Sequence, residues 1–323
     1  MIGKRLFRKM AGFGLILGLA GLIDGCGQPS APAPQGPQKP RVALIMKSLA
    51  NEFFKTMENG ARAHQRRQPQ VYDLLVNGIK DEQDVSRQID LVEQMIAQRV
   101  DAIVIAPADS KALVPVCKKA LSAGIVVVNI DNQLDGAVKA DQGVQIPFVG
   151  PDNRKGARAA GETLARTLHA GDQVALIGGT PNAFNAVQRR LGFEDAMKAH
   201  GITIAATQSG DWEMDKANQV AAALLTAHPD LKALLCANDT MALGAVTALR
   251  AIHKDGQVQV IGFDNISAVQ QLLKEGKILC TVDQHGDQLA VYGIQAALNI
   301  LQTHAKPADR QTPVDLITKA TLK

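Results

Sequence analysis

Short apolar runs alternate along the chain with longer segments in which apolar positions recur at helical spacing. The apolar runs, rich in Val and Ile, are 42–46, 102–106, 126–130, 174–177, 233–236 and 258–263. The segments with helical spacing are 51–68, 84–99, 113–123, 153–169, 189–199, 215–227 and 241–253. Uniformly apolar strands that alternate with helices are typical of parallel sheets covered on both faces. The pattern therefore predicts an α/β fold that begins near Arg41.

The chain also contains an internal repeat. The segment Val42-Ala43-Leu44-Ile45 recurs as Val174-Ala175-Leu176-Ile177 about 132 positions later, and each copy is followed at the same distance by a glycine, Gly60 or Gly192. Two further segments recur in the same order at nearly the same shift: 102–106 as 233–237, and Ile130-Asp131-Asn132 as Phe263-Asp264-Asn265. We therefore predict two similar doubly wound parallel-sheet lobes with a ligand cleft between them.

The N-terminal residues 1–26 have the layout of a secretory signal, in which a basic stretch precedes an apolar run too short to span a bilayer. The segment Leu22-Ile23-Asp24-Gly25-Cys26 resembles a bacterial lipobox, in which Cys26 carries the lipid, although Asp24 departs from that pattern. Ordinary cleavage after Ala20 is the alternative. Residues 27–40, rich in Pro and Ala, are expected to form an extended linker. We expect an exported protein of the periplasm or cell envelope, anchored through Cys26 if the lipobox is used.

Charge and cysteine usage exclude several classes of function. The formal net charge of +4 is modest and includes the basic signal, so it gives little support to nucleic-acid binding. Beyond Cys26 the cysteines are Cys117, Cys236 and Cys280, and an odd number argues against a full disulfide framework. No cysteine or histidine spacing predicts a metal site. We expect no metal, no cofactor and no nucleic-acid partner.

Polar residues stand at the ends of the predicted strands, where ligands of open α/β sheets bind. They are Asn51, Asp131, Asn132, Asn238, Asp239, Asp264 and Gln284. Asx residues after strands also cap helices, and we favour that role for Asp109 and Asp239. Carboxylates and amides that converge in a dry cleft suit a polyhydroxylated ligand, whose C–H faces pack on aromatic rings. Aromatic residues make up only 3% of the chain, yet Phe53, Phe54 and the single tryptophan, Trp212, lie in predicted loops or helix starts.

At these residues the chain resembles the ribose-binding branch of bacterial periplasmic solute-binding proteins, and the similarity runs from about Arg41 to Leu322. The segments that carry it are 47–54, Asn129-Ile130-Asp131-Asn132, 185–193, 237–245, Gly262-Phe263-Asp264 and Thr281-Val282-Asp283-Gln284. The resemblance implies two lobes that close on a sugar like a hinged trap and then dock on a membrane ABC permease. It implies ligand-binding roles for Lys47, Asn51, Phe53, Phe54, Asp131, Arg189, Trp212, Asn238, Asp264 and Gln284.

One position departs from that family. Asn132 stands where the ribose binder has an arginine, and a shorter, neutral amide enlarges the pocket, so we include Asn132 in the predicted site. The expected ligand class widens accordingly to a pentose, hexose, linear polyol or cyclitol. The family's three chain crossings place the first lobe at 41–150 and 285–311, and the second at 151–284 and 312–323. A monomer suits a protein that must close and dock.

Other classes of function fit the sequence less well. The seven histidines show no H-E-x-x-H spacing, and the chain has no G-x-S-x-G, Walker or G-x-G-x-x-G motif, so we predict that it is not an enzyme. A lactose-repressor-type regulator shares the two-lobed core but needs an N-terminal helix-turn-helix, which residues 1–40 do not supply. A sugar receptor for a chemotaxis or sensor-kinase partner would have the same sequence features as a transport protein. The receptor function therefore stays as an alternative to the function of an importer component.

Overall fold

The computed structural model describes residues 39–322, which belong to one compact unit, Lys39–Lys323. The predicted signal (1–26), the lipid-attachment residue Cys26 and all but the last two residues of the predicted linker (27–40) lie outside the described residues. Within 39–322, no helix has both the length and the hydrophobicity needed to cross a membrane. Export and lipid attachment stay predictions.

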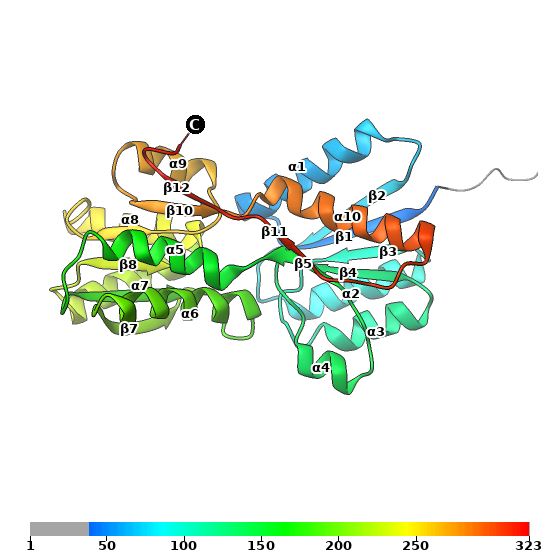
Figure 1. The fold of residues 1–323 in the computed structure, drawn as a ribbon, viewed down its shortest axis with the longest axis horizontal. Coiled ribbons are helices and arrows are strands. Elements are labelled where there is room, and N and C mark those ends of the chain that lie inside the picture. Colours follow the sequence, from blue (N-terminus) through cyan, green and yellow to red (C-terminus); the bar gives the residue numbers. More distant parts are fainter. Residues whose placement is uncertain (1–38, 323) are drawn as a thin grey trace, which may run out of the picture. The chain divides into compact units, whose positions relative to one another are not determined.

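The first sheet has six strands in the order β11-β5-β4-β3-β1-β2, and all neighbouring pairs are parallel (Figure 1). The strands are β1 (Arg41–Ser48), β2 (Asp73–Ile79), β3 (Ala102–Ile105), β4 (Val126–Ile130), β5 (Phe148–Pro151) and β11 (Arg310–Thr312). Alternate side chains of β1 enter different cores: Leu44 packs in one and Ile45 in the other.

Helices cover both faces of this sheet. Those that belong to the core of Leu44 are α1 (Glu52–Arg67) and α10 (Gly286–Thr303); those that belong to the core of Ile45 are α2 (Val85–Ala97) and α3 (Val114–Ser122). The short α4 (Gly136–Asp141) follows β4. We call this sheet and these helices the first lobe.

The second sheet also has six strands, in the order β12-β10-β9-β8-β6-β7. They are β6 (Gln173–Gly178), β7 (Thr203–Ser209), β8 (Ala233–Cys236), β9 (Gln259–Ile261), β10 (Cys280–Asp283) and β12 (Asp315–Thr318). Its helices are α5 (Asn153–Ala165), α6 (Phe184–Ala199), α7 (Met214–Ala227), α8 (Asp239–Ala251) and α9 (Ser267–Lys274). All pairs are parallel except β10–β12, which is antiparallel. We call this sheet and these helices the second lobe.

The two lobes repeat one arrangement, which confirms the predicted fold class. The order β3-β1-β2 in the first sheet has its counterpart in β8-β6-β7 of the second. The repeated glycines lie at close helix crossings: a Cβ on Gly60 of α1 would overlap the backbone of Asp287 in α10. A Cβ on Gly192 of α6 would overlap the backbone of Arg154 in α5. Only glycine permits these backbones to approach so closely.

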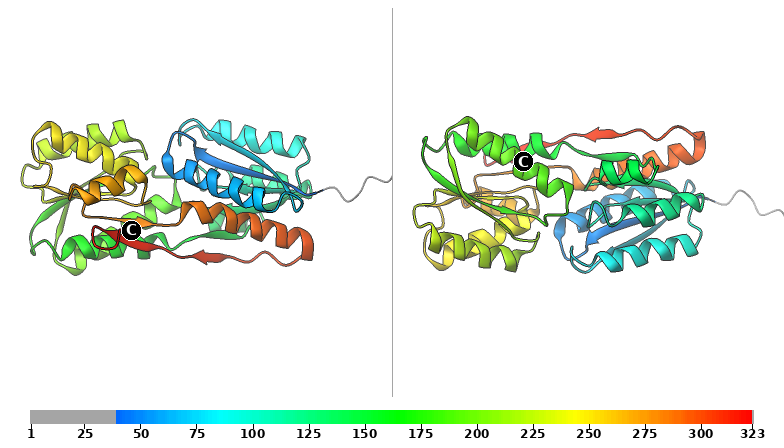
Figure 2. Two further views of the ribbon diagram at one scale, coloured as in Figure 1. Left: turned by 90° about the horizontal axis from the view of Figure 1, so that it is seen from above. Right: turned by 90° about the horizontal axis from the view of Figure 1, so that it is seen from below.

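Three segments join the lobes. The chain leaves the first sheet after β5, returns between β10 and α10 at Gln284 and His285, and leaves again between β11 and β12. Figure 2 shows the last of these, the red C-terminal segment, running from one lobe to the other. His285 has a left-handed backbone (φ 53°) at its crossing, where the chain turns from strand to helix.

The six apolar runs of the sequence are all strands, namely β1, β3, β4, β6, β8 and β9. The strand-like run around Cys280 is β10, and the final strand expected in the second lobe is β12. The strands β2, β5, β7 and β11 and the helices α4, α9 and α10 were not predicted as elements. Helix α6 begins at Phe184, five residues before the predicted start at Arg189. The thiols of Cys117, Cys236 and Cys280 are free and buried.

Candidate ligand-binding site

One cavity is lined by side chains from both lobes, at the carboxyl ends of strands in both sheets. Its lining residues are Lys47, Asn51, Phe53, Phe54, Glu82 and Asp131 from the first lobe, and Asn185, Arg189, Trp212, Asn238, Asp264 and Gln284 from the second lobe and its crossing. The free space between them measures ≈ 10 Å³, about one water molecule, so the side chains of the two lobes nearly fill it. The structure thus brings together ten of the eleven sequence-predicted residues and adds Glu82 and Asn185.

The start of α1 supplies an amide and two aromatic rings. Asn51 is the N-cap of the helix, and its Oδ1 accepts a hydrogen bond from the backbone N–H of Phe53 at 3.0 Å. The rings of Phe53 and Phe54 pack edge to face with centroids 5.2 Å apart, and both side chains are buried. Because the cap uses the carbonyl oxygen of Asn51, its Nδ2 amide group is left to donate, and it donates toward the carboxylate of Glu82.

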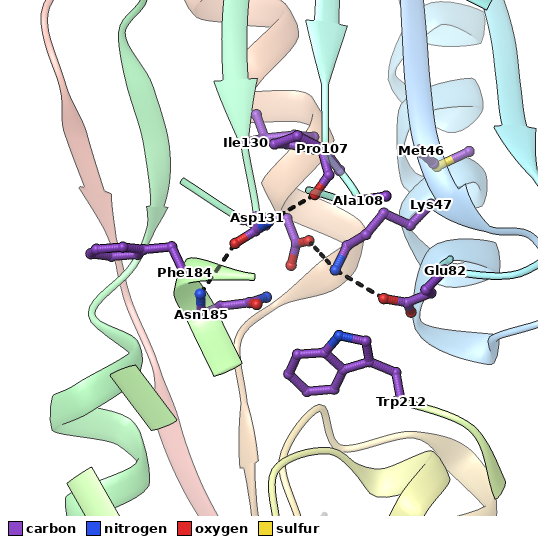
Figure 3. A network of polar contacts seen from close by, with 12 residues as sticks. Met46, Lys47, Glu82, Pro107, Ala108, Ile130, Asp131, Phe184, Asn185 and Trp212 are labelled. Atoms are coloured by element: carbon purple, nitrogen blue, oxygen red, sulfur yellow. Dashed lines mark hydrogen bonds and ion pairs between the residues drawn. The ribbon is translucent and has the colours of Figure 1, made fainter. Parts of the chain in front are cut away.

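A buried lysine pairs with two carboxylates in the first lobe. The Nζ of Lys47 lies 3.0 Å from Oε2 of Glu82 and 3.4 Å from Oδ2 of Asp131. Figure 3 shows Lys47 between these two acidic residues, with the indole of Trp212 nearby. Burial by itself lowers the pKa of Lys47, but the two carboxylates outweigh it and raise the pKa above its ordinary value. The lysine therefore carries its charge, and the charge is neutralised within the lobe.

The second lobe holds one guanidinium in a fixed position. Nε of Arg189 donates to Oδ1 of Asn153 (2.8 Å) and Nη1 donates to the backbone oxygen of Ala237 (2.9 Å). The guanidinium lies over the ring of Phe263, 3.7 Å from its centroid, and 3.5 Å from Oδ1 of Asp264. Burial lowers the pKa of Arg189, and the acidic residues nearby oppose that change.

Asp264 completes this cluster. Its Oδ1 accepts a hydrogen bond from Nε2 of Gln284 at 2.7 Å. Burial raises the pKa of Asp264 well above its usual range, while Arg189 acts in the opposite direction. The neighbouring wall is formed by Asn238, whose Oδ1 caps α8 by accepting from the backbone N–H of Met241 at 2.9 Å.

Three cavity residues that are not glycine have positive φ angles, which bulky residues rarely adopt. They are Asp131 (61°), Trp212 (68°) and Asp264 (126°). The indole of Trp212 is held in place by a hydrogen bond from Nε1 to Oγ1 of Thr180 at 3.0 Å. It packs so closely on Gly179 that no Cβ fits there. Such backbone strain gathers at functional sites, where the surrounding structure maintains it.

Buried acceptor atoms without a partner gather at this cavity. Among the described residues, five buried side-chain atoms lack a hydrogen-bond partner, and three of them belong to the lining: Oδ2 of Asp131, Oδ1 of Asn185 and Oε1 of Gln284. Of these, Oδ2 of Asp131 makes only its 3.4 Å ion pair with Lys47. All three are acceptors. An unsatisfied buried acceptor costs free energy, so this arrangement suits a ligand that donates several hydrogen bonds.

Asn132 lies beside the cavity rather than in its lining. Its Nδ2 donates to the backbone oxygen of Pro107 at 2.8 Å, and its Oδ1 accepts from the backbone N–H of Asn185 at 3.1 Å. Glu82 was not selected from the sequence, because this residue follows β2, a strand that the apolar runs do not predict. The polar segment after Ile79 could have indicated the end of a strand there. Asn185 stood in a segment of the family resemblance but was not selected.

The charged groups do not form a metal centre. In the part of the chain that the structure describes, no group of three His, Cys, Asp or Glu side chains is placed to hold a metal ion. The cations of the cavity are instead the side chains of Lys47 and Arg189, and each lies beside a carboxylate.

The sequence and the fold are similar to known proteins. The model of the periplasmic binding protein domain matches residues 42–306. The chain is 58% identical to the D-ribose/D-allose-binding protein of Pseudomonas aeruginosa, over 90% of this chain and 92% of that protein. An ABC transporter solute-binding protein from Burkholderia multivorans, with an unknown ligand, has 56% identity and a TM-score of 0.85, over 87% of this chain and 100% of its own.

A third similar protein carries a bound sugar. It is an ABC transporter periplasmic solute-binding protein from Actinobacillus succinogenes with bound D-allose, 34% identical, with a TM-score of 0.83. The alignment covers 88% of this chain and 99% of that one. These similarities extend over both lobes and not over a single sheet.

Proposed function

We propose that this chain, which belongs to the periplasmic binding protein family, is the exported solute-binding component of an ABC importer and binds one neutral monosaccharide or polyol. Aldoses such as D-ribose and D-allose are the first candidates, because relatives similar over nearly the whole chain are named for them or hold one. The observation that carries the proposal is the set of three buried acceptors at the cavity that receive no hydrogen bond, of which Oδ2 of Asp131 has only its ion pair with Lys47.

The chemistry of the lining supports a polyhydroxylated ligand. Hydroxyl groups donate to carboxylate and amide oxygens and accept from the amides of Asn51 and Asn238. The rings of Phe53, Phe54 and Trp212 offer apolar surface to the C–H faces of a sugar.

The charges of the site favour a neutral ligand. Lys47 pairs with Glu82 and Asp131, and Arg189 lies beside Asp264, so each cation already has an anionic neighbour within the protein. An anionic ligand would add a charge to three acidic groups that already outnumber the two cations, and a buried charge without compensation costs several kcal/mol. Sugars and polyols avoid that cost.

We infer binding by closure of the two lobes because the residues that line the cavity come from both of them. Each lobe contributes about half of the residues, so only a closed arrangement lets one ligand touch both sets. The ligand then stabilises the closed form by its differential contacts. The three segments between the lobes supply the hinge, and the closed form is the one that a permease would recognise. Attachment through Cys26 would keep the protein at the membrane.

A binding assay tests this function. Protein beginning at Gln28 is unfolded and refolded to remove co-purified solute, and the emission of Trp212 and the Tm are followed against D-ribose, D-allose, myo-inositol and xylitol, with gluconate as a charged control. One neutral compound should bind with a Kd in the micromolar range or below. At 100 times Kd it adds about 2.7 kcal/mol, or a Tm rise of about 5–10 °C. Binding of gluconate alone, or of no compound, contradicts the proposal.

The site assignment is tested by the variants Asp264→Ala and Arg189→Ala. Each leaves ligand hydroxyl groups buried without a partner, so we expect a loss of affinity of about 1–3 kcal/mol, and each also lowers the stability of the protein because its partner charge stays buried. Asp255→Ala is the matched control, because Asp255 forms its ion pair with Lys277 (2.6 Å) away from the cavity. Near-normal affinity in both site variants would refute the assignment.

A further inference from the structure

Helix α6 begins without a capping side chain of its own. Its N-cap is Ala183, whose extended backbone (φ −92°, ψ 124°) is typical of a capping residue but whose methyl group accepts no hydrogen bond. The first backbone N–H groups of the helix, those of Phe184 and Asn185, therefore have no acceptor within their own segment.

The acceptors come from the other lobe. Oγ of Ser110, in the loop after β3, accepts from the N–H of Phe184 at 2.9 Å. Oδ1 of Asn132, just after β4, accepts from the N–H of Asn185 at 3.1 Å. The backbone N–H of Ser110 donates in turn to the oxygen of Asn182 at 3.1 Å. All of these contacts join the first lobe to the second.

The two acceptors are oriented by their own lobe. Nδ2 of Asn132 donates to the oxygen of Pro107 at 2.8 Å, so its Oδ1 faces α6, and a flipped amide would lose both bonds. The hydroxyl of Ser110 donates to that same Oδ1 at 3.3 Å, which leaves its lone pairs for Phe184. The side chain of Asn132 is fully buried, and Ser110 is 4% exposed. Figure 3 shows Phe184 and Asn185 beside Asp131 and Pro107 at this junction.

We propose that Ser110 and Asn132 cap α6 across the cleft and act as a latch on the closed form, so that they set the affinity for ligand without touching it. The inference rests on the proposed function and extends it to residues outside the cavity lining. When the lobes separate, the side chain of Ala183 cannot accept a hydrogen bond in place of Ser110 and Asn132. The N–H groups of Phe184 and Asn185 then donate to water. The latch also positions Asn185, whose side chain lines the cavity.

A latch and a ligand contact have different consequences. The apparent affinity for a ligand equals its intrinsic affinity multiplied by the fraction of the protein that is in the binding-competent form. A weaker latch lowers this fraction, and the affinity for every ligand falls by the same factor. A ligand contact affects ligands unequally, according to the hydroxyl groups they offer. A purely structural residue lowers stability with or without ligand.

Ser110→Ala is the direct test, with Ser122→Ala as the matched control, because Ser122 is exposed at the C-terminal end of α3. Loss of about one net hydrogen bond from the closed form should raise the Kd for D-ribose and D-allose about fivefold or more, by the same factor for both, and mainly through faster dissociation. The Tm of ligand-free protein should stay within about 1 °C of wild type, because the bond is absent from the open form.

Ala183→Ser supplies the missing cap within α6 itself. It should raise the Tm of ligand-free protein, because the N–H groups of α6 are then capped in the open form as well. It should also weaken sugar binding severalfold, because closure of the lobes then forms fewer new hydrogen bonds. Asn132→Ala should weaken both sugars by an equal factor too, but it also removes the bond to Pro107 within the first lobe and so lowers the Tm of ligand-free protein. The opposite effects of Ala183→Ser on stability and affinity would not result from a simple packing defect.

The latch is refuted if Ser110→Ala and Asn132→Ala bind as tightly as wild type, within about twofold, or if they change the ratio of the two sugar affinities. Tighter binding by Ala183→Ser also refutes it. A wild-type protein that binds no sugar refutes the proposed function, and the latch with it. A failure of the proposed function thus appears as a lack of sugar binding by wild type. A failure of the latch alone appears in the affinities of the variants, while wild type binds sugar.

Discussion

Replacing Gly60 with alanine should destabilise the protein, although Gly→Ala stabilises most helices. Gly60 faces the first turn of α10, and an added Cβ would come within 2.7 Å of the carbonyl carbon and 2.8 Å of the Cα of Asp287. The obstacle is backbone, so the two helices must move apart. Such overpacking costs about 1–3 kcal/mol, whereas alanine gains about 0.5–1 kcal/mol in a helix interior. The net loss is about 1–2 kcal/mol, or about 3–6 °C in Tm.

Thermal and urea unfolding followed by circular dichroism measure this effect. Gly136→Ala is the matched control: Gly136 is the first residue of α4, and nothing lies within 4 Å of its Cβ position, so its Tm should stay level or rise slightly. Gly192→Ala should behave as Gly60→Ala does, because its Cβ would lie 2.9 Å from the backbone nitrogen of Arg158. If Gly60→Ala were as stable as wild type, the close crossing of α1 and α10 would not be the reason for a glycine there.

Two further outcomes follow from the buried polar groups. Burial raises the pKa of Asp239 from 3.8 to about 7, so between these values the folded protein holds a proton that the unfolded chain has released. The contribution of Asp239 to the free energy of unfolding should therefore fall by about 1.4 kcal/mol per pH unit between about pH 4 and 7. Unfolding measured across this pH range should show a smaller slope for Asp239→Asn than for wild type. Equal slopes in the two proteins would contradict a raised pKa of Asp239. Asn51→Asp keeps an N-cap for α1 but replaces the amide that donates toward Glu82 by a carboxylate, so calorimetric titration should show weaker sugar binding and the Tm should fall; unchanged affinity in Asn51→Asp would remove Asn51 from the site.

The interior strands could be predicted from the sequence because burial on both faces leaves a continuous apolar run. β1, β3, β6 and β8 are buried along nearly their whole length, and each matched such a run. The edge strands β2 and β7 are half exposed and carry Asn, Thr and Gln, so no run marks them. Their position in the sheet follows from tertiary pairing with β1 and β6, which local sequence does not encode.

The start of α6 illustrates a different limit. A helix start is predicted from a capping residue in the same segment, and Asn51 and Asn238 provide that signal for α1 and α8. Ala183 provides none, because the acceptors for α6 come from the other lobe. The predicted start at Arg189 was therefore five residues late. The same contacts explain why Asn132, expected in the pocket, has its amide engaged beside it.

Helix caps and ligand groups are not exclusive alternatives at the ends of these strands. In Asn51 and Asn238 the carbonyl oxygen accepts from the helix backbone, which fixes the side chain, and the amide nitrogen of the same group is left to donate. Asn185 and Gln284 have the complementary property, since each has a buried acceptor without a partner. The cavity thus presents fixed donors and unsatisfied acceptors together, which is the requirement for a ligand whose hydroxyl groups both give and receive hydrogen bonds. A carboxylate ligand offers only acceptors and an amine cation only donors, so each would leave half of this lining unsatisfied, and the preference for a neutral polyol follows from the helix caps as much as from the charges.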